Sequence, residues 1–113
     1  MQLGKIWKRR ADSLYGVFQE AMQARGLVAY EVVQDFQVRQ IKEMIEHIGE
    51  SNASDVISFA VHNWEDLRKE PGANLSTDPS FNQMIVKWRY GKWLNMMKLR
   101  QQKGGSSLEF VPT

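Results

Sequence analysis

Residues 54–69, SDVISFAVHNWEDLRK, decide the fold, because their apolar side chains repeat with the period of one helix face. Six residues share this face: Val56, Ile57, Ala60, Val61, Trp64 and Leu67. Ser58 and Asn63 fall on the opposite side, which is the pattern of a helix with one buried and one solvated face. Pro71 and Gly72 follow as stop signals. We therefore expect one core helix over this stretch, which the rest of the chain covers.

Two amphipathic helices are predicted before this core helix. Apolar residues keep helical spacing over residues 3–25 and again over residues 35–48, where Asp35 is the expected N-cap. Residues 27–34 are rich in β-branched and aromatic residues, but no second strand pairs with them, so they predict an extended connection. Gly49 is expected to end the second helix. The short link to the core helix predicts antiparallel packing of the two.

A last long helix is predicted from Pro79 to about Gln101. Proline is tolerated at the first helical position, and Asp78 before it is a suitable cap. The apolar residues of this helix fall on two adjoining lines: Phe81, Met84, Ile85 and Trp88 on one, and Tyr90, Trp93, Leu94 and Met97 on the other. Such a surface is too wide for one interface, so part of it is expected to serve a partner.

The sequence predicts an all-α protein, a compact bundle of about four helices with a flexible C-terminal tail. A chain of 113 residues with 42% hydrophobic content suits one domain, which we place at residues 1–103, with the tail at residues 104–113. The absence of cysteine excludes disulfides and thiolate metal sites. No apolar run is long enough to span a bilayer, and the charged start lacks the apolar part of a signal peptide. We expect a cytoplasmic protein.

The charges are divided along the chain. Residues 1–26 carry five bases and two acids, residues 27–86 carry four bases and ten acids, and residues 87–113 carry six bases and one acid. The two ends therefore have net charges of +3 and +5 around a middle of −6. If the first and last helices lie side by side, as an antiparallel bundle permits, their cations form one positive surface.

This surface is the candidate binding site. The residues expected to contact phosphates are Lys8, Arg9, Arg10, Arg89, Lys92 and Arg100. Tyr90 and Trp93, with Trp88 near them, are the aromatic residues that would stack on unpaired bases. The alternative stays open at this point, because lysines on a helix often form only a solvated face and tryptophans at helical spacing often belong to the core.

Catalytic patterns are scarce, so we do not expect an enzyme or a cofactor. Glu43 and His47, one helical turn apart, supply two metal-ligand types on one face, but nothing else in the sequence completes a site. Glu65 and Asp66 are adjacent and point in different directions on a helix, which argues against a pair of catalytic carboxylates. We expect no metal site.

The segment from about Trp7 to Met97 resembles a small helical domain of phage and prophage replication-associated proteins. The likeness is carried by Trp7, the Leu14-Tyr15-Gly16 step, QIKEMIEHIG ending at Gly49, DVISFAVHNWEDLRK with Trp64, and Pro79-Ser80-Phe81. The resemblance implies an accessory role in DNA transactions beside initiators or helicase loaders.

Two functions follow as expectations. The first is a non-enzymatic phage or mobile-element protein that binds single- or double-stranded DNA, or a DNA-processing complex, through its basic terminal helices. The second is a small inhibitor or adaptor that docks on a host protein through the surplus apolar surface of the last helix and the tail residues Leu108 to Val111. In either case the apolar strip also allows a homodimer, and the expected location is the cytoplasm of the host cell.

Overall fold

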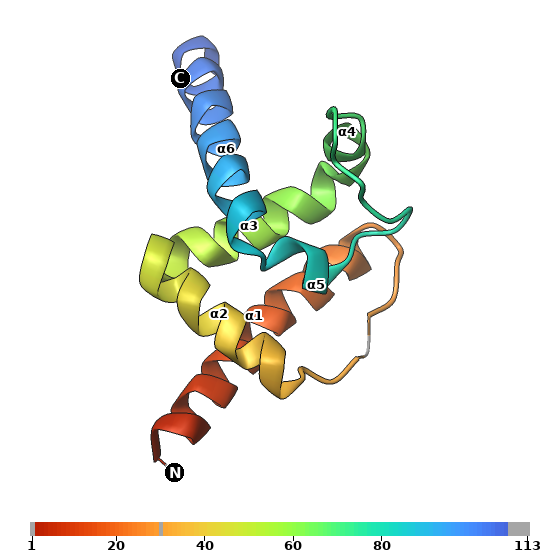
Figure 1. Cartoon of the computed structure of the whole chain (residues 1–113). Helices are drawn as coiled ribbons and strands as arrows, with labels where there is room; N and C mark the ends of the chain where they lie inside the picture. Colours follow the sequence, from red (N-terminus) through yellow and green to blue (C-terminus); the bar gives the residue numbers. More distant parts are fainter. Residues whose placement is uncertain (1, 30, 109–113) are drawn as a thin grey trace.

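The computed structural model describes the backbone of residues 2–29 and 31–108, and the side chains of residues 4–29 and 31–102. Over these residues the chain is all-α: it forms helices and no strand (Figure 1). The helices, in chain order, are α1 (Gln2–Ala24), α2 (Asp35–Ile48), α3 (Glu50–His62), α4 (Trp64–Arg68), α5 (Phe81–Met84) and α6 (Lys87–Leu108).

Helix α1 ends at Ala24, two residues before Gly26. Gly26 has a φ of +76°, which favours glycine, and its amide donates to the carbonyl of Gln23 at 2.9 Å. The amide of Leu27 donates to the carbonyl of Met22 at 2.8 Å. These two bonds form a Schellman motif, which satisfies the last carbonyls of the helix and turns the chain into the extended connection that precedes α2.

Helix α2 begins and ends as predicted, but its N-cap differs. Asp35 is the first helical residue, and the preceding Gln34 donates its amide to the Gln37 side chain, Oε1, at 2.8 Å. The prediction of Asp35 as the cap is therefore wrong by one position. Gly49, with a φ of +87°, separates α2 from α3.

The core helix predicted over residues 54–69 is present as two helices, α3 and α4. Its start lies earlier, at Glu50, so the predicted link between α2 and α3 shrinks to Gly49. The interruption lies at Asn63, whose side-chain amide and backbone amide both donate to the carbonyl of Phe59, at 2.8 and 2.9 Å. All six apolar residues of the predicted face are nevertheless buried, with Trp64 and Leu67 contributed by α4.

The last predicted helix is also divided, into α5 and α6, with a bend at Ile85 and Val86. The cap of α5 is Ser80, whose hydroxyl accepts from the amide of Gln83 at 3.3 Å, so the predicted start at Asp78 and Pro79 is too early. These two divisions explain why the structure has more helices than the predicted four.

Helix α6 continues to Leu108, beyond the predicted end at about Gln101. Residues 104–108 of the predicted tail thus belong to α6 by their backbone. Gly104 and Gly105 weaken a helix by roughly 1 kcal/mol each but do not forbid it, and no proline lies between Lys87 and Leu108. The rest of the predicted tail, residues 109–113, lies outside the described residues.

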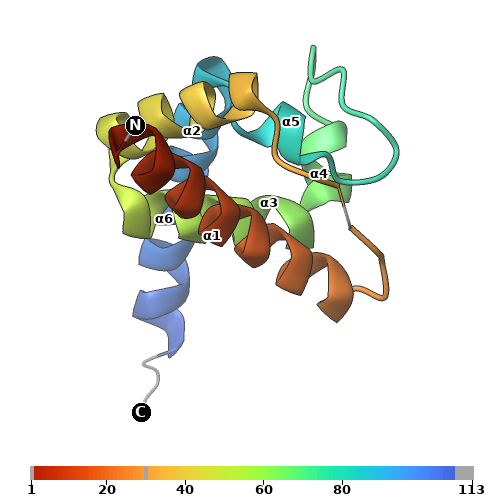
Figure 2. The ribbon, with the colours of Figure 1, turned by 90° about the horizontal axis from the view of Figure 1, so that it is seen from below.

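Helix α3 occupies the centre of the molecule. It packs against α1, α2 and α6, whereas α1 and α6 do not form a packed pair (Figures 1 and 2). The amino end of α1 and the carboxyl end of α6 leave the molecule in different directions, and the second half of α6 projects from the body (Figure 1). The predicted side-by-side placement of the first and last helices is therefore wrong.

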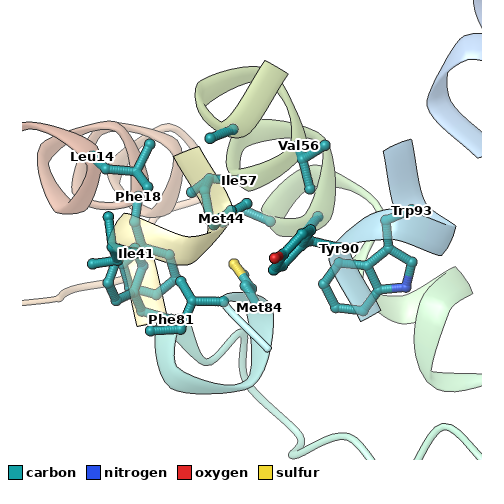
Figure 3. Packing of buried hydrophobic residues seen from close by; sticks show 14 of the residues in the cluster. Leu14, Phe18, Ile41, Met44, Val56, Ile57, Phe81, Met84, Tyr90 and Trp93 are labelled. Carbon is teal, nitrogen blue, oxygen red and sulfur yellow. The ribbon is translucent and has the colours of Figure 1, made fainter. Parts of the chain in front are cut away.

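A single apolar core joins the helices. Leu14 and Phe18 of α1, Ile41 and Met44 of α2 and Ile57 of α3 converge on it, as Figure 3 shows. The aromatic rings of Tyr15, Phe18 and Phe81 pack together with centroid separations of 5.0 to 5.6 Å. This core fixes the direction of α6, which carries the surface described next.

Candidate nucleic-acid interface

The predicted phosphate-binding residues lie on two separate surfaces. Three of them, Lys8, Arg9 and Arg10, are on α1, and the other three, Arg89, Lys92 and Arg100, are on α6. Because α3 lies between these two helices and brings the carboxylate of Glu50 beside Arg10, the six cations do not form the continuous patch that the sequence predicts.

Two of the three predicted cations of α1, Lys8 and Arg10, are engaged within the protein. The ammonium of Lys8 lies 3.2 Å from a carboxylate oxygen of Asp12 and donates to the carbonyl of Val33 at 3.0 Å. Arg10 donates from Nη2 and Nε to Oε1 of Glu50 at 2.6 and 3.1 Å. Arg9 is exposed. In an ion pair, a carboxylate of the same protein neutralises the cation. Helix α1 therefore offers less positive charge to a ligand than its sequence indicates.

Tyr90 and Trp93, the two residues predicted to stack on bases, are buried. Their exposed fractions are 1% and 4%, and Figure 3 shows both side chains inside the core. Trp93 meets the Trp64 ring edge-on at a centroid distance of 6.0 Å, and Tyr90 meets the His47 ring at 5.8 Å. Burial raises the pKa of Tyr90, and the nearby Glu43 carboxylate adds to the rise. The prediction of an exposed stacking role for these two rings is wrong.

Helix α6 nevertheless presents a positive surface, which we call the α6 basic face. It consists of Lys87, Trp88, Arg89, Lys92, Lys98 and Arg100. No acidic residue occurs anywhere in α6. On a helical wheel, Trp88 and Lys92 lie near the centre of the solvent side, with Lys87 and Lys98 along one flank and Arg89 and Arg100 along the other. The face therefore combines cations with one central indole.

Trp88 is 65% exposed, the most exposed aromatic side chain among those that the structure describes. A continuous helix over residues 81–101 would turn it inward beside Phe81 and Met84. The bend at Ile85 and Val86 changes the rotational phase of α6, so Tyr90 turns inward and Trp88 turns outward. Apolar spacing alone places Trp88 on one line with Phe81 and Met84, because nothing in the local sequence indicates the bend.

Arg89 is held in place by backbone carbonyls. Its Nη2 donates to Ala73 at 3.0 Å and its Nη1 donates to Gln83 at 3.3 Å. Its Cζ lies 4.0 Å from the centroid of the Trp88 ring, so the guanidinium covers one side of the indole. Partial burial lowers the pKa of Arg89, although a guanidinium remains charged at neutral pH.

The other cations of this face are less restrained. Lys92 approaches the carboxylate of Glu70 at 3.5 Å, a long contact between two largely exposed groups, which contributes little. Arg100 donates to the side-chain oxygen of Asn63 at 2.8 Å and lies 5.2 Å from the ring centroid of Phe59, so it keeps its charge unneutralised there. Lys87 and Lys98 are exposed.

Two other hollows of the described surface differ in charge. One, of about 410 Å³ at the amino end of α1, is lined by Lys5, Lys8 and Arg9 together with Asp12. The other, of about 490 Å³ beside Tyr15 and Phe81, is bordered by the carboxylates of Glu31 and Asp78. Among the described residues, no group of three or more metal-ligating side chains comes together, so Glu43 and His47 gain no third ligand.

Comparison with protein-family models, with curated proteins and with solved structures finds no match for this chain. Within the described residues, none of the helices combines the length and the apolar character needed to cross a bilayer.

Proposed function

We propose that this protein is a non-enzymatic accessory protein that binds nucleic acid, DNA above all, through the α6 basic face. The observation that carries the proposal is a helix with exposed cations and no carboxylate of its own, whose second half projects from the body. The resemblance of its sequence to phage replication-associated domains favours DNA, or a DNA-processing complex in the host cytoplasm, over other polyanions.

The binding would be mainly electrostatic. Lys87, Lys92, Lys98 and Arg100 would contact phosphates, and each contact would release a counterion. Lys92 would exchange its long contact with Glu70 for a phosphate. Since each neutralised phosphate contributes about −0.9 to the slope of log affinity against log salt on duplex DNA, four contacts give a slope of about −3.6.

The test is a titration of fluorescently labelled single strands and duplexes at several salt concentrations. The proposal expects affinity that falls steeply as salt rises, and a slope that becomes shallower when lysines of the α6 basic face are replaced by glutamine. Absence of salt-dependent binding to either form of DNA would refute it.

A second candidate is docking on a protein, favoured by Leu99. This side chain is 59% exposed on the projecting part of α6, on the same side of the helix as Trp88. Phosphate binding gives no role to an exposed leucine at this position. Capture of a host protein that resists nuclease and disappears in Leu99→Asp would support docking, and concentration-dependent mass in light scattering would show whether the partner is a second copy.

A further inference from the structure

Trp88 differs from an ordinary exposed side chain because the protein holds its ring in position. The guanidinium of Arg89 lies on one side of the indole, 4.0 Å from its centroid. Arg89 in turn cannot swing freely, since Ala73 and Gln83 accept hydrogen bonds from two of its nitrogens. One side of the ring is thus covered, and the ring is still 65% exposed.

The support of Arg89 reaches back to the core. Ala73 belongs to the loop between α4 and α5, and the buried indole of Trp64 donates to the carbonyl of Ser76 in this loop at 2.9 Å. The amide of Ser76 also donates to the side chain of Gln83 at 3.1 Å. Because the loop is bonded to both the core and α5, the acceptors of Arg89 have fixed positions.

We infer that Trp88 is a stacking platform for an unpaired base, so that the α6 basic face prefers single-stranded nucleic acid to duplex. The inference rests on the proposed function. A prearranged indole loses little conformational freedom when a flat ligand covers its open side. Base stacking on an aromatic ring tolerates any sequence, because each base has a π-face.

The surroundings of the ring suit a strand. Lys87 adjoins Trp88 in the chain, and Lys92 lies one helical turn further, so cations lie on both sides of the ring along the helix. Beside the indole lies a recess of about 100 Å³, which is lined by residues 70–73, including the carboxylate of Glu70, and by Leu67, Leu75, Trp88, Arg89, Lys92 and Trp93. Phosphates that flank the stacked base would meet the two lysines, whereas a duplex keeps its bases stacked inside and offers no face to the indole.

The experiment compares the full chain with Trp88→Ala on three labelled probes of equal length: an oligothymidylate, the corresponding duplex, and an abasic strand. We expect Trp88→Ala to weaken binding to the oligothymidylate by at least about fivefold, and to leave binding to the duplex and the abasic strand within about twofold. Trp88→Phe, which retains a ring, should restore most of the affinity.

Two controls keep the result specific. Leu99→Ala removes an apolar side chain of similar exposure from the same helix and should leave binding to the oligothymidylate unchanged. Circular dichroism and thermal unfolding of each variant should match the parent, since Trp88 lies outside the core cluster.

The outcomes separate this inference from the proposed function. Equal losses of affinity for all three probes, or no loss of affinity for the oligothymidylate, would overturn the stacking role of Trp88. Salt-dependent binding would still support the proposed function. The exposed Trp88 ring would then be assigned to contact with a protein partner. If the parent protein binds none of the three probes at low salt, the proposed function fails and the inference fails with it.

Discussion

Two tryptophan–arginine stacks lie outside the core, one on α1 and one on α6. Their sequences, KIWKRR at 5–10 and KWRYGK at 87–92, are similarly basic and aromatic. The Cζ of Arg10 lies 4.3 Å from the Trp7 ring, and that of Arg89 lies 4.0 Å from the Trp88 ring.

The arginines of the two stacks differ in what holds them. Arg10 is bonded to the carboxylate of Glu50, which neutralises its charge and ties α1 to α3. Arg89 is bonded to neutral carbonyls and keeps its charge.

The rings differ as well. Trp7 is partly buried against the core, with Lys42 of α2 also 5.7 Å from its centroid, whereas Trp88 is 65% exposed. The first stack joins helices, and the second presents a ring to solvent. Two similar tryptophan–arginine pairs thus have different roles, because one arginine is bound to a carboxylate of another helix and the other is bound to neutral carbonyls.

The largest expected difference between the two regions concerns binding. Reversing two charges on α6, Lys87→Glu with Lys98→Glu, should weaken binding to single-stranded DNA on the order of 100-fold at low salt, since it replaces two phosphate contacts by repulsion. The matched reversal on α1, Lys5→Glu with Arg9→Glu, changes the net charge equally and should cost only a few-fold. Fluorescence anisotropy measures both.

Equal losses from the two pairs would show that overall charge, rather than the α6 basic face, governs binding. Circular dichroism of both double variants serves as the control, because all four side chains are exposed.

The next difference concerns stability. Trp7→Ala should lower the free energy of unfolding by about 2 kcal/mol, because the ring packs against the core and supports the side chain of Arg10. Trp88→Ala should change it by less than about 0.5 kcal/mol, since the ring is mostly in solvent. Urea unfolding of the two variants decides the order, and a larger loss in Trp88→Ala would contradict the assignment of the two stacks.

Replacing the carboxylate that pairs with a cation in each region should change stability and DNA affinity less. Glu50→Gln should destabilise the protein by no more than about 1 kcal/mol, because both partners of the pair with Arg10 are partly exposed, and should leave DNA affinity unchanged. Glu70→Gln should barely alter stability, but it should strengthen DNA binding a few-fold by releasing Lys92. Weaker binding in Glu70→Gln would mean that Lys92 needs this carboxylate for its position.

The smallest effect concerns Tyr90, within the α6 segment. Its hydroxyl is buried and has no hydrogen-bond partner among the described residues, so Tyr90→Phe should leave stability unchanged or raise it by up to about 1 kcal/mol. A loss of more than about 1 kcal/mol on urea unfolding would show that the hydroxyl has a partner.

The same tyrosine gives a pH dependence. Burial raises the pKa of Tyr15 and of Tyr90 above the ordinary 10.0, so the folded state keeps their protons longer than the unfolded state does. The contribution of these groups to stability is complete below pH 10.0 and is lost as the pH rises above it. Tyr90→Phe should lessen this alkaline loss, as thermal unfolding at increasing pH would show.

Much of the fold could be predicted from apolar periodicity. The spacing of Val56, Ile57 and Trp64 predicts a core helix, and all three are buried. The break at Asn63 did not spoil this prediction, because α4 continues the same buried face.

The break at Ile85 and Val86 had the opposite effect. It rotates α6, so Trp88 leaves the line of Phe81 and Met84, and the candidate site changes with it. Isoleucine and valine are compatible with a helix, so local sequence gives no sign of this bend; packing of α5 and α6 against α3 decides it.

Counting charges along the sequence also could not predict which cations are available to a ligand. It found that the two ends of the chain are basic, but the pairing of Arg10 with Glu50 and the bonds from Arg89 to two carbonyls join residues far apart in the chain. Which cations remain available to a ligand is therefore a property of the tertiary structure.

The most direct test of the α6 basic face is to follow the NMR signals of the four indole N–H groups during titration with an oligothymidylate, each signal being assigned by its loss in the corresponding tryptophan-to-phenylalanine variant. We predict that the Trp88 signal shifts with the added strand, while those of the buried Trp64 and Trp93 and of Trp7 stay in place. A shift of the Trp7 signal with Trp88 unmoved, or no shift at all, would contradict the assignment of α6 as the binding surface.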